Sequence, residues 1–165
     1  MEKRYNYLGE DLGTTKPKFI SPKFMKTTPE GKIVPNWAID DGVTVDDNGF
    51  DRTNVECNGR YIEDVELPRG TKLCRYGKSN GYTTALLNTP YEKLGLPYVK
   101  ETQEYHEYEV IADGLTVKCI VTRGRVAPMF NSPGGAIQFL HKVRIIEEIN
   151  SGKLKEVTSW LNKKN

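Results

Sequence analysis

The sequence predicts an α+β fold built mainly on an antiparallel β-sheet, with few short helices and a loop-rich N-terminal arm. Short segments of β character dominate the second half of the chain, and their connections have hairpin length. Strands and helices do not alternate regularly, as they would in a parallel α/β protein. Turn formers and tyrosine are also abundant, with 15 Gly, 9 Pro and 9 Tyr in 165 residues.

Residues 1–50 form the predicted arm, because turn-forming residues recur along them at short intervals and no hydrophobic period survives. We expect extended chain that wraps on the domain or is partly disordered at its start. Apolar side chains in the second half are expected to dock the arm: Trp37, Ile39, Val43 and Phe50. The chain then divides into this extension and a domain at 51–165.

The first predicted strand is Thr71–Tyr76, which follows a turn at Leu67–Gly70. Alternation along the strand places Leu73 and Arg75 on one face. A tight connection at Gly77–Gly81 follows, because two glycines fall within this short segment. The domain therefore begins as a strand that leads directly into a glycine-containing loop.

The predicted elements continue with extended chain at 82–87 and a helical turn or loop at 89–97. Strands are then expected at 105–111, 115–121, 124–128 and 136–143. The pair Asp113-Gly114 predicts a hairpin turn between the first two of these strands.

The one convincing helix begins at Ile145. Its three isoleucines, Ile145, Ile146 and Ile149, are predicted to share one face, with Glu147 and Glu148 on the other. Gly152 follows at the position of a C-terminal cap. A short strand at 153–155 and a terminal turn at 157–161 complete the prediction.

Charge and hydropathy exclude several classes of protein. Lys and Arg number 24 against 22 Asp and Glu, so the formal charge is +2 and no basic field for nucleic acid is expected. No apolar stretch approaches the roughly 18 residues of a membrane span, and Met1–Glu10 is too polar for a signal peptide. The acidic segments Asp40–Gly42 and Asp46–Gly49 are interpreted as solvated turns, not as a calcium site.

Cysteine and histidine give no recognisable metal or disulfide pattern. The three cysteines, Cys57, Cys74 and Cys119, lack C-x-x-C spacing and do not all pair, so no disulfide framework is expected. The two histidines, His106 and His141, are interpreted as surface or strand residues. We therefore expect no metal site.

Two segments have compositions that point to chemistry. In CRYGKSNGY, Arg75 is followed by Gly77 and Gly81, so a guanidinium beside accessible backbone offers a phosphate-binding fork, although plain turn chemistry explains the same pattern. In APMFNSPGGAIQF, Gln138 lies between Ile137 and Phe139. If those two face the core, Gln138 faces either solvent or a cleft, and the residues leave both open.

Five blocks, taken in order, resemble the tuberculosis necrotizing toxin (TNT) domain family. They are LPRGTKLCRYGKSNGY, TPYEKLGLPY, YHEYEV, GRVAPMFNSPGGAIQF and RIIEEINSGKLKEV, from Leu67 to Val157. The resemblance implies an NAD glycohydrolase that also hydrolyses NADP, releasing nicotinamide and the ADP-ribose product. The dinucleotide is then the substrate, and no cofactor is implied.

The resemblance also implies roles for individual residues. Arg75 falls on the family's arginine near the dinucleotide phosphates, and Gln138 falls on the glutamine regarded as essential for activity. Lys93 stands nearest to where many members carry a second arginine before their Leu-Pro, but an ammonium lacks the forked geometry. The substrate-binding residues implied are Tyr82, Lys93, Phe130, Gly134 and Gly135.

This chemistry needs few protein groups, because nicotinamide departs from NAD as a neutral molecule and requires no general acid. Holding the diphosphate, orienting the ribose and presenting a water suffice in principle. Many NAD-cleaving enzymes also place a glutamate near the reacting carbon, and the sequence leaves open whether Glu147, Glu148 or another acid does so.

The toxin resemblance further implies a cognate immunity protein as a partner, and secretion or delivery into the cytosol of a target cell. An immunity protein and delivery into a target cell are typical of polymorphic toxins and secreted effectors. Two alternatives remain open: an ADP-ribosyltransferase toxin, which breaks the same bond but replaces water with another nucleophile, and an inactive β-rich binding module.

Overall fold

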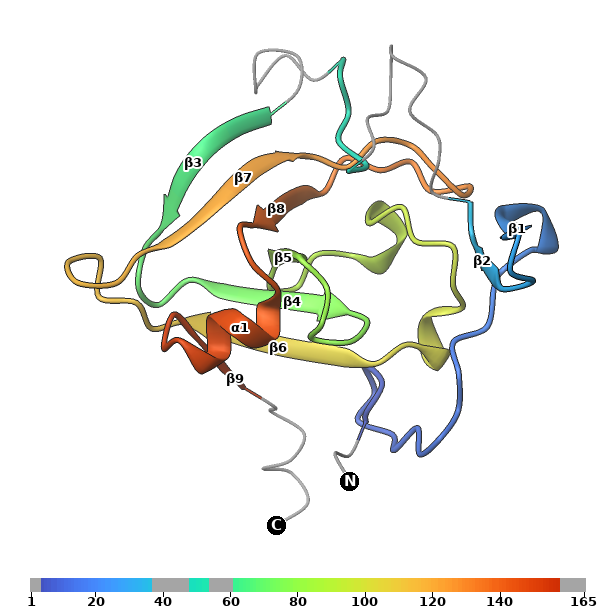
Figure 1. The fold of residues 1–165 in the computed structure, drawn as a ribbon, viewed down its shortest axis with the longest axis horizontal. Coiled ribbons are helices and arrows are strands. Elements are labelled where there is room, and N and C mark those ends of the chain that lie inside the picture. Colours follow the sequence, from blue (N-terminus) through green and yellow to red (C-terminus); the bar gives the residue numbers. More distant parts are fainter. Residues whose placement is uncertain (1–3, 37–47, 54–60, 158–165) are drawn as a thin grey trace.

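The computed structural model describes residues 4–36, 48–53 and 61–157. Within these ranges the main element is a seven-stranded antiparallel sheet with the order β3-β7-β8-β5-β4-β6-β9 (Figure 1). A separate two-stranded sheet pairs β1 with β2, and one α-helix, α1, is present in the described part. The expectation of a mainly antiparallel β fold with few short helices is therefore confirmed.

The strands are β1 (Met25–Thr27), β2 (Ile33–Pro35), β3 (Tyr61–Leu67), β4 (Lys72–Tyr76), β5 (Thr83–Leu86), β6 (Tyr105–Val110), β7 (Cys119–Arg125), β8 (Ile137–His141) and β9 (Leu154–Glu156). The helix α1 spans Ile145–Asn150, and short 3₁₀ turns lie at Pro22–Phe24, Tyr91–Lys93 and Lys100–Thr102. The helix is too short for a membrane span, as is every other helix that the structure describes.

β4, β5, β6, β8, β9 and α1 lie where the sequence predicts them, but β3 was not predicted. Three acidic residues lie on this strand, and its pairing with β7 shifts register between Ile62 and Val65. Asp64 has a φ of 57° at that irregularity. The acidic residues and the bulge mask the alternation that identifies a strand. β1 and β2, in the arm, were also not predicted as strands.

The hairpin predicted at Asp113-Gly114 is wrong. β6 lies between β4 and β9, whereas β7 lies between β3 and β8, so the two strands do not pair. The Asp113 carboxylate instead accepts N–H bonds from Leu115, Thr116 and Val117 at 2.8–3.1 Å, which folds the connection into a loop. The two strands predicted at 115–121 and 124–128 are the single strand β7.

The arm contacts the domain at several points. The Tyr5 carbonyl accepts a bond from Tyr105 N on β6 at 2.8 Å, and Phe19 forms an isolated bridge with Tyr98. Phe50 is fully buried and bridges Val126 just beyond β7. The other expected docking residues, Trp37, Ile39 and Val43, lie outside the described residues, as do residues 158–161 of the predicted terminal turn.

The main core lies between the sheet and α1, and contains Leu73, Tyr108, Val121, Phe139 and Ile145, among other buried residues. The helix is rotated relative to the prediction. Ile145 and Glu148 are 0% and 1% exposed, whereas Ile146 is 40% exposed. With 3.6 residues per turn, positions i, i+3 and i+4 share a face, so Ile145 brings Glu148 and Ile149 to the sheet.

The sheet bends strongly. Figure 1 shows β3, β7 and β8 rising above β4 and β6, with α1 near β6 and β9 at one end. The segments 87–104 and 126–136 lie together at the opposite end. The strand ends of β4, β5 and β8 therefore meet loop segments from two distant parts of the chain.

Candidate active site

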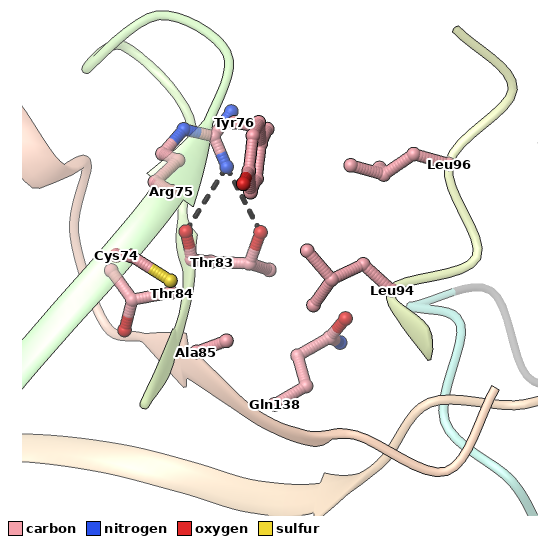
Figure 2. Close-up of a pocket in the computed structure, with 9 residues that line it drawn as sticks. All are labelled: Cys74, Arg75, Tyr76, Thr83, Thr84, Ala85, Leu94, Leu96 and Gln138. Carbon is pink, nitrogen blue, oxygen red and sulfur yellow. Dashed lines mark hydrogen bonds between the residues drawn. The ribbon is translucent and has the colours of Figure 1, made fainter. Parts of the chain in front are cut away.

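Arg75 and Gln138 line the same cavity, of about 490 Å³, with walls from β4, β5, β8 and the 94–96 and 126–129 segments. A smaller cavity of about 50 Å³ adjoins it and is also lined by both residues (Figure 2). Cavities of several hundred cubic ångströms are typical of small-molecule sites. The full lining of the larger cavity is Asn48, Gly49, Arg75, Tyr82, Thr83, Leu94, Gly95, Leu96, Val126, Met129, Gln138, Leu140 and His141.

Gln138 points into this space from near the start of β8. Its cross-strand partners are Ala85 on β5 and Gly124 on β7, both of which are small and leave room on that face. Nε2 donates to the Asn48 carbonyl at 3.0 Å, which fixes the orientation of the amide. The sequence left open whether this side chain faces solvent or a cleft, and in the structure it faces the cleft.

Arg75 lies at the end of β4 and is held by the loop that follows it. Nε donates to Lys78 O at 2.7 Å, and Nη1 donates to Thr83 O and Thr83 Oγ1 at 3.0 Å each (Figure 2). An arginine side chain has five N–H donors, so these three bonds leave the two on Nη2. Burial lowers the pKa of Arg75, while Tyr108 and Glu104 oppose that shift. The guanidinium remains charged and has little freedom to move.

Gly81 permits this arrangement. A Cβ at Gly81 would lie 2.0 Å from Arg75 Nη2, which no side chain tolerates without displacement. Gly77 has a φ of 125°, a region that favours glycine. The glycines of CRYGKSNGY therefore do bring backbone close to a charged group, and that group is the arginine of the same motif.

Tyr82 also lines the cavity and is 41% exposed. The Arg144 guanidinium lies over its ring, at 5.0 Å from the centroid. Such a contact restrains the ring through cation–π attraction. Tyr82 thus offers an aromatic face at the rim of the cavity.

Four residues that the resemblance implied for substrate do not line either cavity. Lys93 ends a 3₁₀ turn with its side chain exposed, while Leu94, the next residue, points into the cavity (Figure 2). Phe130 is 8% exposed and packs edge-on against Phe24 of the arm, with ring centroids 5.2 Å apart.

The glycine pair Gly134-Gly135 closes the backbone on itself and not on the cavity. A Cβ at Gly134 would lie 2.5 Å from Val126 O, and Gly135 N donates to the same carbonyl at 2.7 Å. Both glycines have positive φ, at 66° and 92°. They form the tight return between β7 and β8 that brings Gln138 into position.

The apolar wall of the cavity, formed by Leu94, Leu96, Met129 and Leu140, was not predicted from the sequence. The block TPYEKLGLPY contains two of these leucines beside Gly95, and that closely spaced Leu-Gly-Leu was the available signal. Thr83, whose carbonyl and hydroxyl bind Arg75, was also missed.

A polar cluster lies on the far side of the 77–81 loop, around a further cavity of about 340 Å³. His106 Nε2 is 3.1 Å from Glu104 Oε1, and its Nδ1 contacts Glu156. Burial alone would lower the pKa of His106, but hydrogen bonds to the two glutamates raise it to about 9. Arg4 from the arm completes the cluster through Glu104 at 3.5 Å.

Comparison with known proteins places this chain in a family. The sequence model described as "Tuberculosis necrotizing toxin" matches residues 66–157. The chain is 32% identical over 129 residues to the conidial surface nicotinamide adenine dinucleotide glycohydrolase nadA of Aspergillus fumigatus. That match covers 64% of this chain and 53% of the relative, so the chain spans about half of the relative's length.

Among solved structures, tuberculosis necrotizing toxin complexed with its immunity factor IFT is similar, with a TM-score of 0.56 and 20% identity. The match covers 80% of this chain and 66% of that one. The fold and the cavity thus define a β-sheet protein of the TNT type, with a guanidinium and an amide facing one ligand-sized space. The family match spans more than half of the chain, and the chain belongs to the tuberculosis necrotizing toxin family.

Proposed function

We propose that this protein is an NAD glycohydrolase that releases nicotinamide and ADP-ribose. One observation carries the proposal: Arg75 and Gln138, both within the segment that matches the family, line the same cavity. The identity to a protein named as a nicotinamide adenine dinucleotide glycohydrolase supports the same reaction.

In the proposed mechanism Arg75 binds the diphosphate through the positive charge of its guanidinium. The three bonds to Lys78 and Thr83 fix the guanidinium before substrate arrives, so little conformational freedom is lost on binding. A preorganised cation positions the dinucleotide so that its nicotinamide ribose reaches β8.

Gln138 is proposed to act at the reacting ribose. Because Nε2 is bound to Asn48 O, the amide carbonyl is the end left to face the substrate. As the C–N bond breaks, positive charge grows on the ribose, and a carbonyl dipole beside it stabilises that charge. The same oxygen can accept a hydrogen bond from a ribose hydroxyl or the attacking water. Tyr82 would hold the substrate at the cavity rim.

NADP is proposed as a second substrate, because it shares the nicotinamide riboside and the diphosphate with NAD. We also propose a toxin role with a cognate immunity protein. The support for that partner is the similar structure, which is a toxin complexed with its immunity factor. Secretion, or delivery into a target cell, belongs to the same proposal.

The test is incubation of the purified chain with NAD alone, with nicotinamide and ADP-ribose measured by chromatography. We expect the two products in equal amounts and at a rate proportional to enzyme. The control variant Lys142→Ala should keep this activity. Lys142 lies just beyond β8, and its exposed ammonium pairs with Asp64 at 2.7 Å, outside the cavity.

Two results would contradict the proposal. Intact NAD after prolonged incubation would favour a binding module. Nicotinamide release without free ADP-ribose would show transfer to another nucleophile, as in an ADP-ribosyltransferase.

A further inference from the structure

Three buried side chains with metal-ligating atoms meet on the core face of the sheet. Cys119 begins β7, His141 ends β8 and Glu148 lies on α1. They are 0%, 2% and 1% exposed. The cysteine sulfur, a histidine ring nitrogen and a carboxylate oxygen all lie within 4.8 Å of one another. The three residues are far apart in the sequence, so spacing alone does not reveal them.

The sheet register explains why they meet. Val121 on β7 pairs with His141 on β8, so these two side chains lie on the same face of the sheet. Cys119 is two residues before Val121 on the same strand, so its side chain also lies on that face. The helix covers this face, and Ile145 and Glu148 point toward it together. A glutamate therefore takes a position where an amphipathic helix ordinarily has an apolar residue.

Two polar atoms in this cluster lack partners. In the part of the chain that the structure describes, the buried side-chain nitrogens and oxygens without a hydrogen bond are His141 Nδ1 and Glu148 Oε2. The distance from His141 Nδ1 to Glu148 Oε1 is 3.5 Å. Charge-assisted hydrogen bonds are shorter, at about 2.7–2.9 Å. Leaving such groups unpaired in a core is costly, so an unpartnered pair indicates a missing ligand.

Thr84 on β5 orients the imidazole. Its Oγ1 lies 2.8 Å from His141 Nε2. When Nε2–H donates to this hydroxyl, Nδ1 carries a lone pair directed at the carboxylate. Metal-ligating histidines commonly use their second nitrogen in this way, because that bond fixes the tautomer. Two acceptors facing each other then need either a proton or a metal cation between them.

We propose that Cys119, His141 and Glu148 form a structural site for a divalent zinc-type ion. Thiolate, imidazole and carboxylate together are a donor set that suits zinc. Two negative ligands and a neutral imidazole also balance a 2+ charge, so the filled site is neutral in a buried region. Glu148 Oε2 or a water supplies the fourth ligand.

The geometry fits with small adjustments. Tetrahedral zinc with bonds of about 2.0–2.3 Å holds its ligand atoms roughly 3.5 Å apart. The 3.5 Å between His141 Nδ1 and Glu148 Oε1 already has this value. The ligand atoms separated by up to 4.8 Å need to close by about 1 Å. The bound ion would join β7, β8 and α1, and so fix the strand that carries Gln138.

The test uses chain without a histidine tag, in which Cys57→Ser and Cys74→Ala leave Cys119 as the one thiol. Cobalt is the probe, because a thiolate bound to Co²⁺ gives a charge-transfer band in the near ultraviolet. We expect the band to saturate at one equivalent and to disappear when zinc is added. In otherwise natural chain, Cys119→Ser should abolish it, although Cys57 and Cys74 remain.

No band in the chain with Cys119 alone, or a band that persists in Cys119→Ser, would overturn the site. In that case a proton between His141 Nδ1 and the Glu148 carboxylate, and not a metal ion, would bridge the two groups. If circular dichroism shows that a variant does not fold, the zinc content of the natural chain is the test of the site. After zinc loading and dialysis, mass spectrometry should find one zinc per chain, and substoichiometric zinc would overturn the proposal.

Discussion

Gln138 carries the most specific expectation at the scale of a single residue. Its amide nitrogen is anchored by Asn48, and its carbonyl is the end that we propose meets the ribose of the substrate. Gln138→Ala should lower the rate of nicotinamide release about a hundredfold, because a contact made mainly in the transition state contributes about 3 kcal/mol. Steady-state assays should show the loss in kcat, with unchanged thermal unfolding. Full activity in a folded variant would remove Gln138 from the mechanism.

Gly81 tests the packing around Arg75. In Gly81→Ala the new Cβ would overlap Arg75 Nη2, so the guanidinium or the loop has to move. Overpacking of this kind costs about 1–3 kcal/mol, and we expect lower thermal stability together with a higher KM for NAD. Lys78→Ala is the matched control in the same loop, because Arg75 binds the backbone carbonyl there and not the side chain. Equal thermal stability and equal KM for the two variants would contradict the close contact between Gly81 and Arg75.

His106 predicts a pH dependence of stability. Its pKa is raised from 6.5 to about 9 in the folded protein by Glu104 and Glu156, against the effect of burial. A raised pKa stabilises the fold fully below pH 6.5, and this contribution is lost as the pH rises through about 9. We expect a loss of roughly 3 kcal/mol across that range.

The measurement is chemical unfolding of the natural chain and of His106→Gln at several pH values. The variant should lack most of the decline between neutral and alkaline pH, because glutamine does not titrate. Parallel curves for the two proteins would show that His106 carries no such linkage.

Predictability from sequence differed between site residues for a physical reason. Arg75 and Gln138 stand in distinctive motifs, and the structure brings both to one cavity. Gly134 and Gly135 have equally distinctive sequence, yet their backbone closes on Val126 and not on the cavity. A motif shows that the backbone must approach something closely, but only three-dimensional contacts show what.

At the scale of elements, the helix gives a direct test of which face is buried. Ile145 is fully buried and Ile146 is 40% exposed, contrary to the shared face that the sequence predicts. Ile145→Ala should lower the free energy of unfolding by about 2–5 kcal/mol, and Ile146→Ala by about 1 kcal/mol or less. Urea titrations of the two variants make the comparison, and equal losses would contradict the observed rotation.

The elements themselves were predictable where local patterns were strong. β6 and β8 have alternating or β-branched sequences, and Gly152 follows α1 as expected. The pairing of the strands was not predictable in the same way. Asp113-Gly114 has the local chemistry of a hairpin turn, yet β6 pairs with β4 and β9 and not with β7. Which strands pair depends on long-range packing, and a dipeptide does not encode it.

On the scale of the whole molecule, the bend of the sheet matters most. It places the ends of β4, β5 and β8 against the 94–96 and 126–129 segments, and these five parts of the chain enclose one cavity together with Asn48 and Gly49. The core under α1 supports the other face of β8. A rigid strand therefore carries Gln138, and the loop around Arg75 is fixed by its own hydrogen bonds.

A crystal structure of Gln138→Ala grown with NAD tests the central claim most directly, because the slowed variant retains its substrate. We predict the diphosphate beside the Arg75 guanidinium, and the nicotinamide ribose beside residue 138. Dinucleotide bound outside the cavity that these two residues line, in a variant that has lost activity, would contradict the account.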